Sequence, residues 1–345
     1  MHISEFDYEL PEELIAQAPL KARDASRMMV VDRAAGSWKE TAFASFPDLL
    51  RAGDVVVVNN TRVFPARLIG ERDPSGGRVE LLLLREIDQS VWEALARPAH
   101  RLNEGARIRF QDSLLRAKVI GSAAGGVRRI QFTGETDINA SIERIGQTPL
   151  PPYIKRPDGT SVQDVERYQT VFASEKGAIA APTAGLHFTP EVLKRISEVG
   201  AQTAEITLHV GYGTFEPVRV EQIEEHQVAA EFFSISEPVA KTLNKARAAG
   251  GRIIAIGTTT TRALETAIDE KGLITAGTGD TALTIKPGYK FRAVDALLTN
   301  FHLPRSSLLI LVSAFAGREL ILDAYKAAVA SRFRFYSYGD CMFVI

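Results

Sequence analysis

The chain has a single cysteine, Cys341, among its 345 residues. One cysteine cannot form an internal disulfide, and it excludes a zinc site built from several cysteines. The longest apolar run, SSLLILVSAFAG at residues 306–317, is shorter than the ~20 residues that a membrane-spanning helix requires. Residues 1–20 carry acidic side chains instead of a basic segment followed by an apolar run, so we expect no signal peptide. These absences predict a cytoplasmic protein without a membrane anchor.

A strong charge of either sign is also missing. The formal net charge is −1, with 45% hydrophobic and 24% charged residues, which argues against a protein that simply coats a polyanion. Residues 59–150 hold 14 Lys and Arg against 11 Asp and Glu, and residues 289–345 hold 7 against 4. A local basic surface therefore remains possible if the fold gathers these residues. The length suggests about two domains.

The sequence changes in texture at two points. Residues 55–58 are four valines, which is typical of a strand buried on both faces. Short alternating segments bounded by Gly, Pro, Asn or Asp then follow and predict a small antiparallel β-module, a barrel or a sandwich, over residues 59–151. Beyond the proline-rich stretch 146–160, helices and strands alternate, which predicts an α/β domain with a mixed or parallel sheet. We therefore expect a discontinuous α/β domain, residues 1–58 and 152–345, with this β-module inserted into it.

A histidine lies in the glycine-bearing approach to a predicted helix, AAPTAGLHFTPEVLKRI at residues 180–196. Thr189 is a suitable N-cap and Pro190 suits the first helical position. His187 precedes this helix N-terminus, whose dipole favours the neutral imidazole. The alternative is a partly buried histidine that is satisfied by backbone groups.

Other predicted strand ends also carry polar groups, and in α/β sheets ligands gather beyond the carboxyl ends of strands. TLHVGYGTFEPV places His209 and Tyr212 after one strand, although a glycine-rich hairpin turn would explain the same pattern. IGTTTTRALE places threonines at a helix start that could bind an anion, unless one threonine is only an N-cap. LLTNFHLPRSS supplies Asn300 and His302, and Asn300 could instead end its strand by a side-chain turn.

Several common catalytic motifs are absent. The sequence has no G-x-x-x-x-G-K-[ST], no H-E-x-x-H and no G-x-S-x-G, which argues against a P-loop ATPase, a zinc metalloprotease and a serine hydrolase of the α/β class. The histidines are scattered without ligand spacing, so we expect no metal site.

Together these strings resemble one family, the S-adenosylmethionine:tRNA ribosyltransferase-isomerases of queuosine biosynthesis. The matching stretches run from FDYELPEELIAQAPL through VVVNNTRVFPARL, LPPYIKR, ERYQTVFA, AAPTAGLHFT, TLHVGYGTFEPV, IGTTTTRALE and DALLTNFHLPRSSLLILVSAFAG to the terminal FYSYGDCMFVI. Two places depart from the family's pattern. EEHQVAAE lacks a second histidine and a methionine between His226 and Glu231, and GTTTTRALE has threonines where serine and valine are common.

The resemblance implies a specific reaction. Members transfer the ribosyl portion of S-adenosylmethionine to 7-aminomethyl-7-deazaguanine at the tRNA wobble position, which gives epoxyqueuosine and releases adenine and methionine. The resemblance also implies an α/β domain with an inserted β-barrel. S-adenosylmethionine is a consumed substrate, so no cofactor is expected. We expect a monomer.

This chemistry suggests roles for the residues. A sulfonium acidifies the neighbouring ribose C5′ hydrogens, so a base of moderate pKa is needed, and His187, His209 and His302 are the three candidates. The methionine carboxylate would suit the threonines at their helix start, and Tyr212 could face the sulfonium or stack on adenine. The residues expected to bind S-adenosylmethionine are Thr183, Gly185, Gly211, Tyr212, Gly213, Thr258, Thr259, Thr260, Arg262 and Asn300.

An anticodon loop is recognised by base stacking and by Lys and Arg on phosphates. The candidates for tRNA contact are Arg62, Arg67, Lys155, Arg156 and Arg334. Arg334 belongs to the aromatic and basic segment 331–339, which could equally be a final strand with alternating sides. Two other functions fit less well: a non-catalytic RNA-binding factor, and another S-adenosylmethionine-dependent RNA-modifying transferase.

Overall fold

A mixed β-sheet forms the larger part of the protein. The computed structural model describes residues 1–157, 159–215 and 218–345, and nine strands in this part of the chain form one sheet. Its four central strands are parallel to one another, and antiparallel strands complete both sides. Across the sheet the strands are β15 (Gly277–Thr281), β13 (Glu231–Ile235), β12 (Gln202–Leu208), β3 (Val55–Asn59), β14 (Ile253–Ile256), β16 (Ala296–Asn300), β17 (Cys341–Val344), β1 (Arg27–Asp32) and β2 (Ser37–Ala42).

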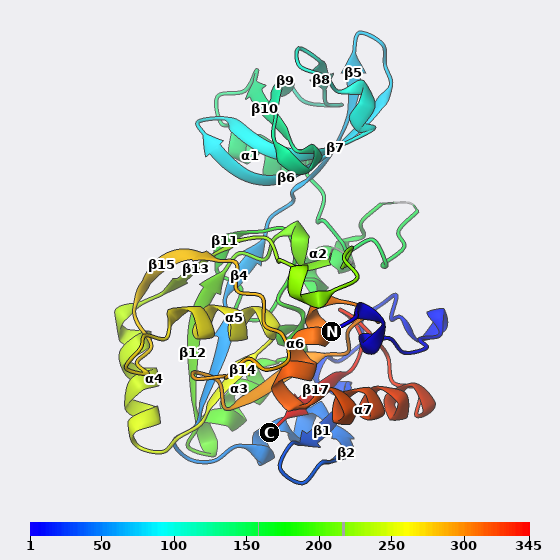
Figure 1. Ribbon diagram of the computed structural model, residues 1–345. Coiled ribbons are helices and arrows are strands. Elements are labelled where there is room, and N and C mark those ends of the chain that lie inside the picture. The colour runs from blue at the N-terminus through cyan, green and yellow to red at the C-terminus, as the bar shows by residue number, and fades with distance from the viewer. Residues whose placement is uncertain (158, 216–217) are drawn as a thin grey trace.

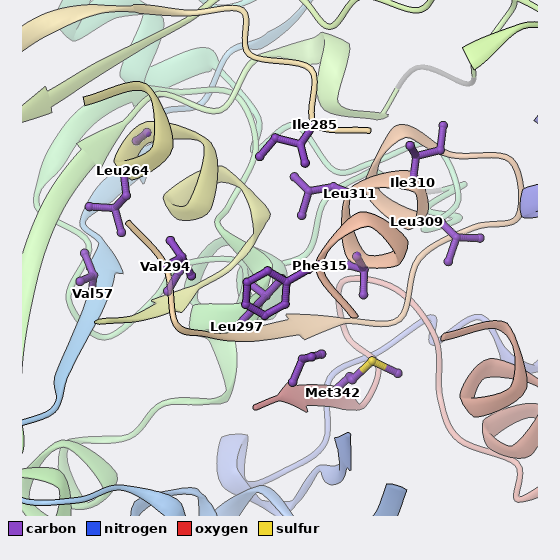
Figure 2. Packing of buried hydrophobic residues seen from close by; sticks show 14 of the residues in the cluster. Val57, Leu264, Ile285, Val294, Leu297, Leu309, Ile310, Leu311, Phe315 and Met342 are labelled. Carbon is purple, nitrogen blue, oxygen red and sulfur yellow. The ribbon is translucent and has the colours of Figure 1, made fainter. Parts of the chain in front are cut away.

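The four-valine strand β3 shows why the sheet is covered on both faces. Val55 and Val57 point into one apolar cluster, and Val56 and Val58 point into another, because successive side chains of a strand alternate between faces. Figure 2 shows the first cluster, in which Leu264, Leu309 and Phe315 pack over Val57, Leu297 and Met342. The helices over this face are α4 (Glu237–Ala248), α5 (Thr258–Ala267), α6 (Ser307–Ala316) and α7 (Arg318–Ala330), and the other face is covered by α3 (Pro190–Glu198) and the 3-10 helices η4 (Phe43–Leu49) and η7 (Thr183–His187).

A closed antiparallel barrel is the second unit, drawn above the α/β body in Figure 1. Leu81 and Leu83 point into the barrel core, whereas Leu82 between them lies on its outer face. The expected α/β sheet with an inserted antiparallel barrel is therefore confirmed. In order around the barrel the strands are β10 (Arg128–Thr133), β7 (Val91–Arg97), β6 (Arg78–Asp88), β5 (Arg67–Asp73), β8 (Arg107–Arg109) and β9 (Arg116–Ser122).

The barrel is joined to the α/β body by paired segments. Short strand β4 (Thr61–Val63) precedes the barrel and pairs in parallel with β11 (Glu175–Ala178), which follows it. Helix α1 (Ile138–Ile145) and helix α2 (Val162–Arg167) flank the return segment. All six barrel strands lie within the expected 59–151 range, while the boundaries themselves remain a prediction.

Several local predictions can be compared with the structure. Helix α3 begins at Pro190 with the Thr189 hydroxyl accepting the Val192 N–H, as predicted. The alternative of a strand at 331–339 is wrong, because β17 begins only at Cys341. Phe333 and Phe335 are instead buried side chains of a loop.

Candidate active site

Four parallel strands end at the same edge of the sheet and bring distant segments together. Strands β12, β3, β14 and β16 are neighbours in that order. Their carboxyl ends lead to His209, Asn59, Gly257 and Asn300. This edge is where ligands bind in open α/β sheets, so the polar strand ends singled out in the sequence converge on one side of the molecule.

A cavity of about 190 Å³, here called the edge cavity, opens at this edge. Of the residues expected to bind substrate or act as the base, it contains Thr183, Thr258, Thr259, Asn300 and His302. Its other lining residues are Tyr153, Ala181, Pro182, Ala184, Val210, Gly257, Thr299, Phe301, Leu303, Pro304, Arg305, Ser306, Leu308, Tyr336 and Ser337.

The N-terminus of α5 supplies polar groups to the edge cavity. Gly257 is the N-cap with a φ of 94°, a left-handed conformation that glycine adopts readily. The Thr261 N–H is the first to bond within the helix, to Gly257 O at 3.1 Å, so the N–H groups of Thr258, Thr259 and Thr260 have no acceptor in the helix. Such N–H groups bind anions. The alternative of a threonine N-cap is wrong.

Thr260 differs from its two neighbours. Its hydroxyl donates to Ile256 O at 2.7 Å and its side chain is fully buried. It is absent from the lining of the edge cavity, unlike Thr258 and Thr259. Only two of the three threonine side chains therefore line the edge cavity.

Asn300 links the edge cavity to surrounding segments. Its Oδ1 accepts the Thr183 hydroxyl at 2.9 Å. Its amide group donates to Tyr336 O at 3.2 Å and lies 3.2 Å from His187 Nε2. The alternative role, a local side-chain turn that ends the strand, is not what Asn300 does, because these partners come from other parts of the chain.

His187 lies behind Asn300 and does not line the edge cavity. Because an amide nitrogen only donates, His187 Nε2 accepts from Asn300, and Nδ1–H is donated to the Ser26 hydroxyl at 2.7 Å. The ring packs on Phe43 with centroids 5.3 Å apart. Burial, with smaller contributions from nearby arginines, lowers the His187 pKa to about 3. The imidazole is therefore neutral, as expected, but both nitrogens are occupied.

His302 is the one expected base that lines the edge cavity. Its Nε2 lies 2.9 Å from the Thr299 hydroxyl, and its Nδ1 has no hydrogen-bond partner among the described residues. Its backbone is fixed on both sides, since its carbonyl accepts the Tyr8 hydroxyl and its N–H donates to the Tyr325 hydroxyl. Burial lowers the His302 pKa to about 3, so the side chain is neutral at pH 7.

His209 lies at the edge of the sheet but outside the edge cavity. Its Nδ1 is 2.8 Å from the Thr61 hydroxyl, and its ring stacks on Phe232. A Cβ at Gly177 would come within 2.6 Å of His209 Nε2, so glycine is required for this packing. Burial lowers the His209 pKa. These contacts place His209 in the joint formed by β4, β11 and β13.

Arg262 has internal partners at every donor group. Its Nη1 is 2.5 Å from Glu231 Oε2, its Nε donates to Leu283 O and its Nη2 donates to Thr281 O. Glu231 in turn accepts the Gly211 N–H at 2.8 Å. This buried ion pair holds the segment after β12, so Arg262 supports the site from outside the edge cavity.

The expected residues of the GYG segment face other surroundings. Gly211 and Tyr212 line a second cavity of about 320 Å³, here called the interdomain cavity, between the barrel and the α/β body. Gly213 lies close to Ala229, and Gly185 is packed against Phe172. A tight hairpin turn is not formed, because residues 209–230 separate β12 from β13.

The expected tRNA-contacting residues fall into two groups. Arg67, Lys155 and Arg156 line the interdomain cavity. Arg62 is exposed on β4, and Arg334 donates to Ala18 O in the loop before β17. The structure therefore brings together only three of the five.

Two tyrosines of the edge cavity were missed in the sequence. Tyr153 and Tyr336 pack with ring centroids 4.0 Å apart. Tyr336 has a φ of 73°, and positive φ is uncommon for a residue other than glycine. Their segments, LPPYIKR and FYSYG, attract attention in the sequence as family-matching stretches and for their basic residues, not for these two tyrosines. Tertiary pairing of segments almost two hundred residues apart has no local signal.

In the described ranges, no group of three or more His, Cys, Asp or Glu side chains is placed to hold a metal ion. None of the described helices has the length and apolarity needed to cross a bilayer.

Known proteins of similar sequence and structure identify the family. The chain matches the profile of the family described as "Queuosine biosynthesis protein" over residues 3–344. S-adenosylmethionine:tRNA ribosyltransferase-isomerases from Symbiobacterium thermophilum and Moorella thermoacetica are each 51% identical to it, over 100% of both chains. The crystal structure of S-adenosylmethionine tRNA ribosyltransferase from Thermotoga maritima has a TM-score of 0.57 at 36% identity, over 99% of this chain and 100% of that chain. This chain belongs to the queuosine biosynthesis protein family.

Proposed function

We propose that this protein is a transferase-isomerase that moves the ribosyl moiety of S-adenosylmethionine to 7-aminomethyl-7-deazaguanine at the wobble position of tRNA. The products are epoxyqueuosine in tRNA, adenine and methionine. Full-length similarity to S-adenosylmethionine:tRNA ribosyltransferase-isomerases supports this activity. The observation that carries the residue assignment is the edge cavity, where a free helix N-terminus, an aromatic pair and a neutral histidine meet.

The α5 N-terminus is assigned to the methionine carboxylate. The N–H groups of Thr258 and Thr259 have no acceptor in the helix, and both residues line the edge cavity. A carboxylate there would be stabilised by hydrogen bonds and by the helix dipole. The aromatic faces of Tyr153 and Tyr336 lie in the same cavity and suit the sulfonium or the adenine ring.

Proton removal from the ribose C5′ is assigned to His302. The described residues that line the edge cavity include no Asp, Glu or Lys, so His302 carries the one side chain there that can accept a proton at neutral pH. Burial keeps it unprotonated but lowers its pKa to about 3, which makes it a weaker base than the reaction favours, so the assignment rests on its position in the cavity. His187 is assigned a positioning role, since it contacts Asn300 and not the cavity.

The direct test is product analysis. The protein is incubated with S-adenosylmethionine and tRNA bearing the deazaguanine precursor, and the small molecules are separated by chromatography. Free adenine and methionine are expected. S-adenosylhomocysteine would indicate a methyltransferase instead, and the absence of any S-adenosylmethionine binding would indicate an RNA-binding factor.

The base assignment has its own test. His302→Gln keeps a polar side chain of similar reach but removes the basic nitrogen, so adenine release is expected to fall by about 100-fold or more. S-adenosylmethionine affinity, measured by calorimetry, should change much less. Retention of wild-type turnover by this variant would exclude His302 as the base.

A further inference from the structure

One wall of the interdomain cavity is an apolar part of the outer face of the barrel. Strands β5, β6 and β7 of the barrel turn their outer face toward it, and paired Leu82 and Leu95 lie on that face. Tyr212 and a run of prolines, 149, 151 and 152, form other walls. Outer faces of small barrels are normally polar, so two leucines and an aromatic side chain lining one cavity suit a flat apolar ring.

A charged pair lies in the same cavity. Arg67 Nη2 is 3.0 Å from Glu80 Oε2, and about a quarter of each side chain is exposed, 28% and 27%. Arg67 Nη1 has no hydrogen-bond partner among the described residues, whereas its Nε, also without one, is buried and not offered to a ligand. Glu80 Oε1 likewise accepts no hydrogen bond from them. The pair therefore retains both a donor and an acceptor for a ligand.

The other basic residues at the rim differ in whether they form an ion pair. Lys155 pairs with Glu12, and Arg156 pairs with Asp164. Arg97 is exposed and forms no ion pair with the described residues. Since the other three cations have carboxylate partners, Arg97 is the rim side chain that suits a phosphate of an entering nucleotide.

The two cavities are adjacent because consecutive residues of the same segments line them. Ala181 lines the edge cavity and Ala180 lines the interdomain cavity. Likewise, Val210 lines the edge cavity and Gly211 lines the interdomain cavity. If the proposed function holds, the amine of the tRNA base must reach the ribosyl carbon in the edge cavity. The base itself must then lie in the adjacent interdomain cavity.

Resting on that function, we propose that the interdomain cavity holds the extruded wobble nucleotide and that Arg67 and Glu80 read the Watson–Crick edge of its guanine-type base. That edge presents an acceptor, O6, beside two donors, N1–H and N2–H. A guanidinium beside a carboxylate presents the complementary order, donor then acceptor. Adenine would place its N1 lone pair against the carboxylate, and it would be rejected.

The test uses Glu80→Gln, which keeps the size of the side chain but removes its charge and half of its acceptor capacity. With precursor-bearing tRNA, adenine release is expected to lose about 10- to 100-fold in kcat/KM, the discrimination that one bidentate base contact provides. S-adenosylmethionine affinity should stay within about 2-fold of wild type. Arg67→Lys, which removes the fork of parallel donors, should show a similar loss.

Glu71→Gln is the matched control. Glu71 forms a comparable pair with Arg109 on the same barrel, at 2.8 Å, but lies outside the interdomain cavity. This variant should keep wild-type kcat/KM and the same unfolding midpoint as Glu80→Gln. A second readout is binding to matched tRNAs with guanine or adenine at the wobble position. Wild type should prefer guanine, and Glu80→Gln should lose most of that preference.

The outcomes separate the two proposals. If wild type releases no adenine, the proposed function fails whatever the variants do. If wild type releases adenine and Glu80→Gln keeps both its turnover and its preference for guanine, only the assignment of Arg67 and Glu80 is overturned.

Discussion

The amide of Asn300 lies 3.2 Å from His187 Nε2, and through this contact a histidine outside the edge cavity fixes a residue inside it. His187 is in turn held by Ser26 and Phe43. The chain Ser26–His187–Asn300–Thr183 thus connects the N-terminal segment to the loop before α3. Such a network keeps its members in one geometry only if each polar group is satisfied.

Replacing His187 should reveal a positioning role. His187→Phe keeps an aromatic ring against Phe43 but takes the His187 partner from one N–H of the Asn300 amide and from the Ser26 hydroxyl, which should cost about 1–3 kcal/mol of unfolding free energy for each group left unsatisfied. His187→Gln, whose carbonyl can accept from Asn300, should recover part of both stability and turnover. Urea unfolding and adenine release measure the two effects.

The pH–rate profile provides the control. Because His187 is assigned no proton transfer, His187→Gln should lower kcat without shifting the profile. A displaced profile would instead make His187 the base.

Acid should destabilise the protein before its carboxylates titrate. The pKa values of His187 and His302 are lowered to about 3 by burial, against about 6.5 in the unfolded chain. The unfolded state therefore binds more protons between these values, and stability is lost as the pH falls below about 6.5. Each histidine should contribute a slope approaching 1.4 kcal/mol per pH unit.

Urea unfolding at pH 7, 6 and 5 measures this slope above the range where most carboxylates protonate. His187→Phe should reduce it by about one proton, since one of the two histidines whose pKa is lowered to about 3 is gone. An unchanged slope would contradict the buried, neutral state of His187.

Arg262 should matter for stability more than for substrate affinity. Arg262→Met removes the buried ion pair with Glu231 and keeps the Glu231 charge, a loss of about 3–5 kcal/mol in unfolding free energy. Adding Glu231→Gln removes that buried charge, so the double variant should be more stable than Arg262→Met alone. A large drop in S-adenosylmethionine affinity with normal unfolding would restore Arg262 to the substrate-binding set.

The strand ends could be predicted from the sequence because their signals are local. Four valines predict a strand buried on both faces, and β3 indeed sends Val55 and Val56 into opposite clusters. Parallel order then brings the ends of β14 and β16 to one edge, so Thr258 and Asn300 could be placed together before any coordinates. The short alternating segments likewise predict an antiparallel barrel or sandwich, and the structure shows the barrel.

Side-chain direction could not be predicted in the same way. Three consecutive threonines look alike in the sequence, yet the Thr260 hydroxyl donates to Ile256 O, because Gly257 is the N-cap and α5 begins at Thr258. Arg262 follows them in the sequence, but its guanidinium forms an ion pair with Glu231. Glu231 belongs to β13, a strand near one side of the sheet. Such contacts depend on tertiary packing, which no short window of sequence encodes.

The threonines provide a matched pair of variants for S-adenosylmethionine binding. Thr258→Val with Thr259→Val removes two hydroxyls from the edge cavity and keeps the side-chain volume, so KM for S-adenosylmethionine should rise by about 10-fold. Thr260→Val is the same change on the buried face and should lower stability by about 1 kcal/mol without moving KM. Equal effects on KM would remove the distinction between the two faces of α5.

Binding to tRNA should depend steeply on salt, and Arg62 should contribute to that dependence. Arg62 is exposed on β4 beside the joint to the barrel and forms no ion pair with the described residues. Each phosphate neutralised in a single-stranded loop adds about 0.7 to the slope of log Kd against log salt. Arg62→Ala should therefore lower the slope by about 0.7, the value for one phosphate contact. Arg129→Ala, at an exposed position of barrel strand β10 outside the interdomain cavity, is the control. Titrations between 50 and 200 mM salt distinguish Arg62→Ala from Arg129→Ala. A flat response in wild type would argue against phosphate contacts. Equal slopes for Arg62→Ala and wild type would place the anticodon loop away from β4.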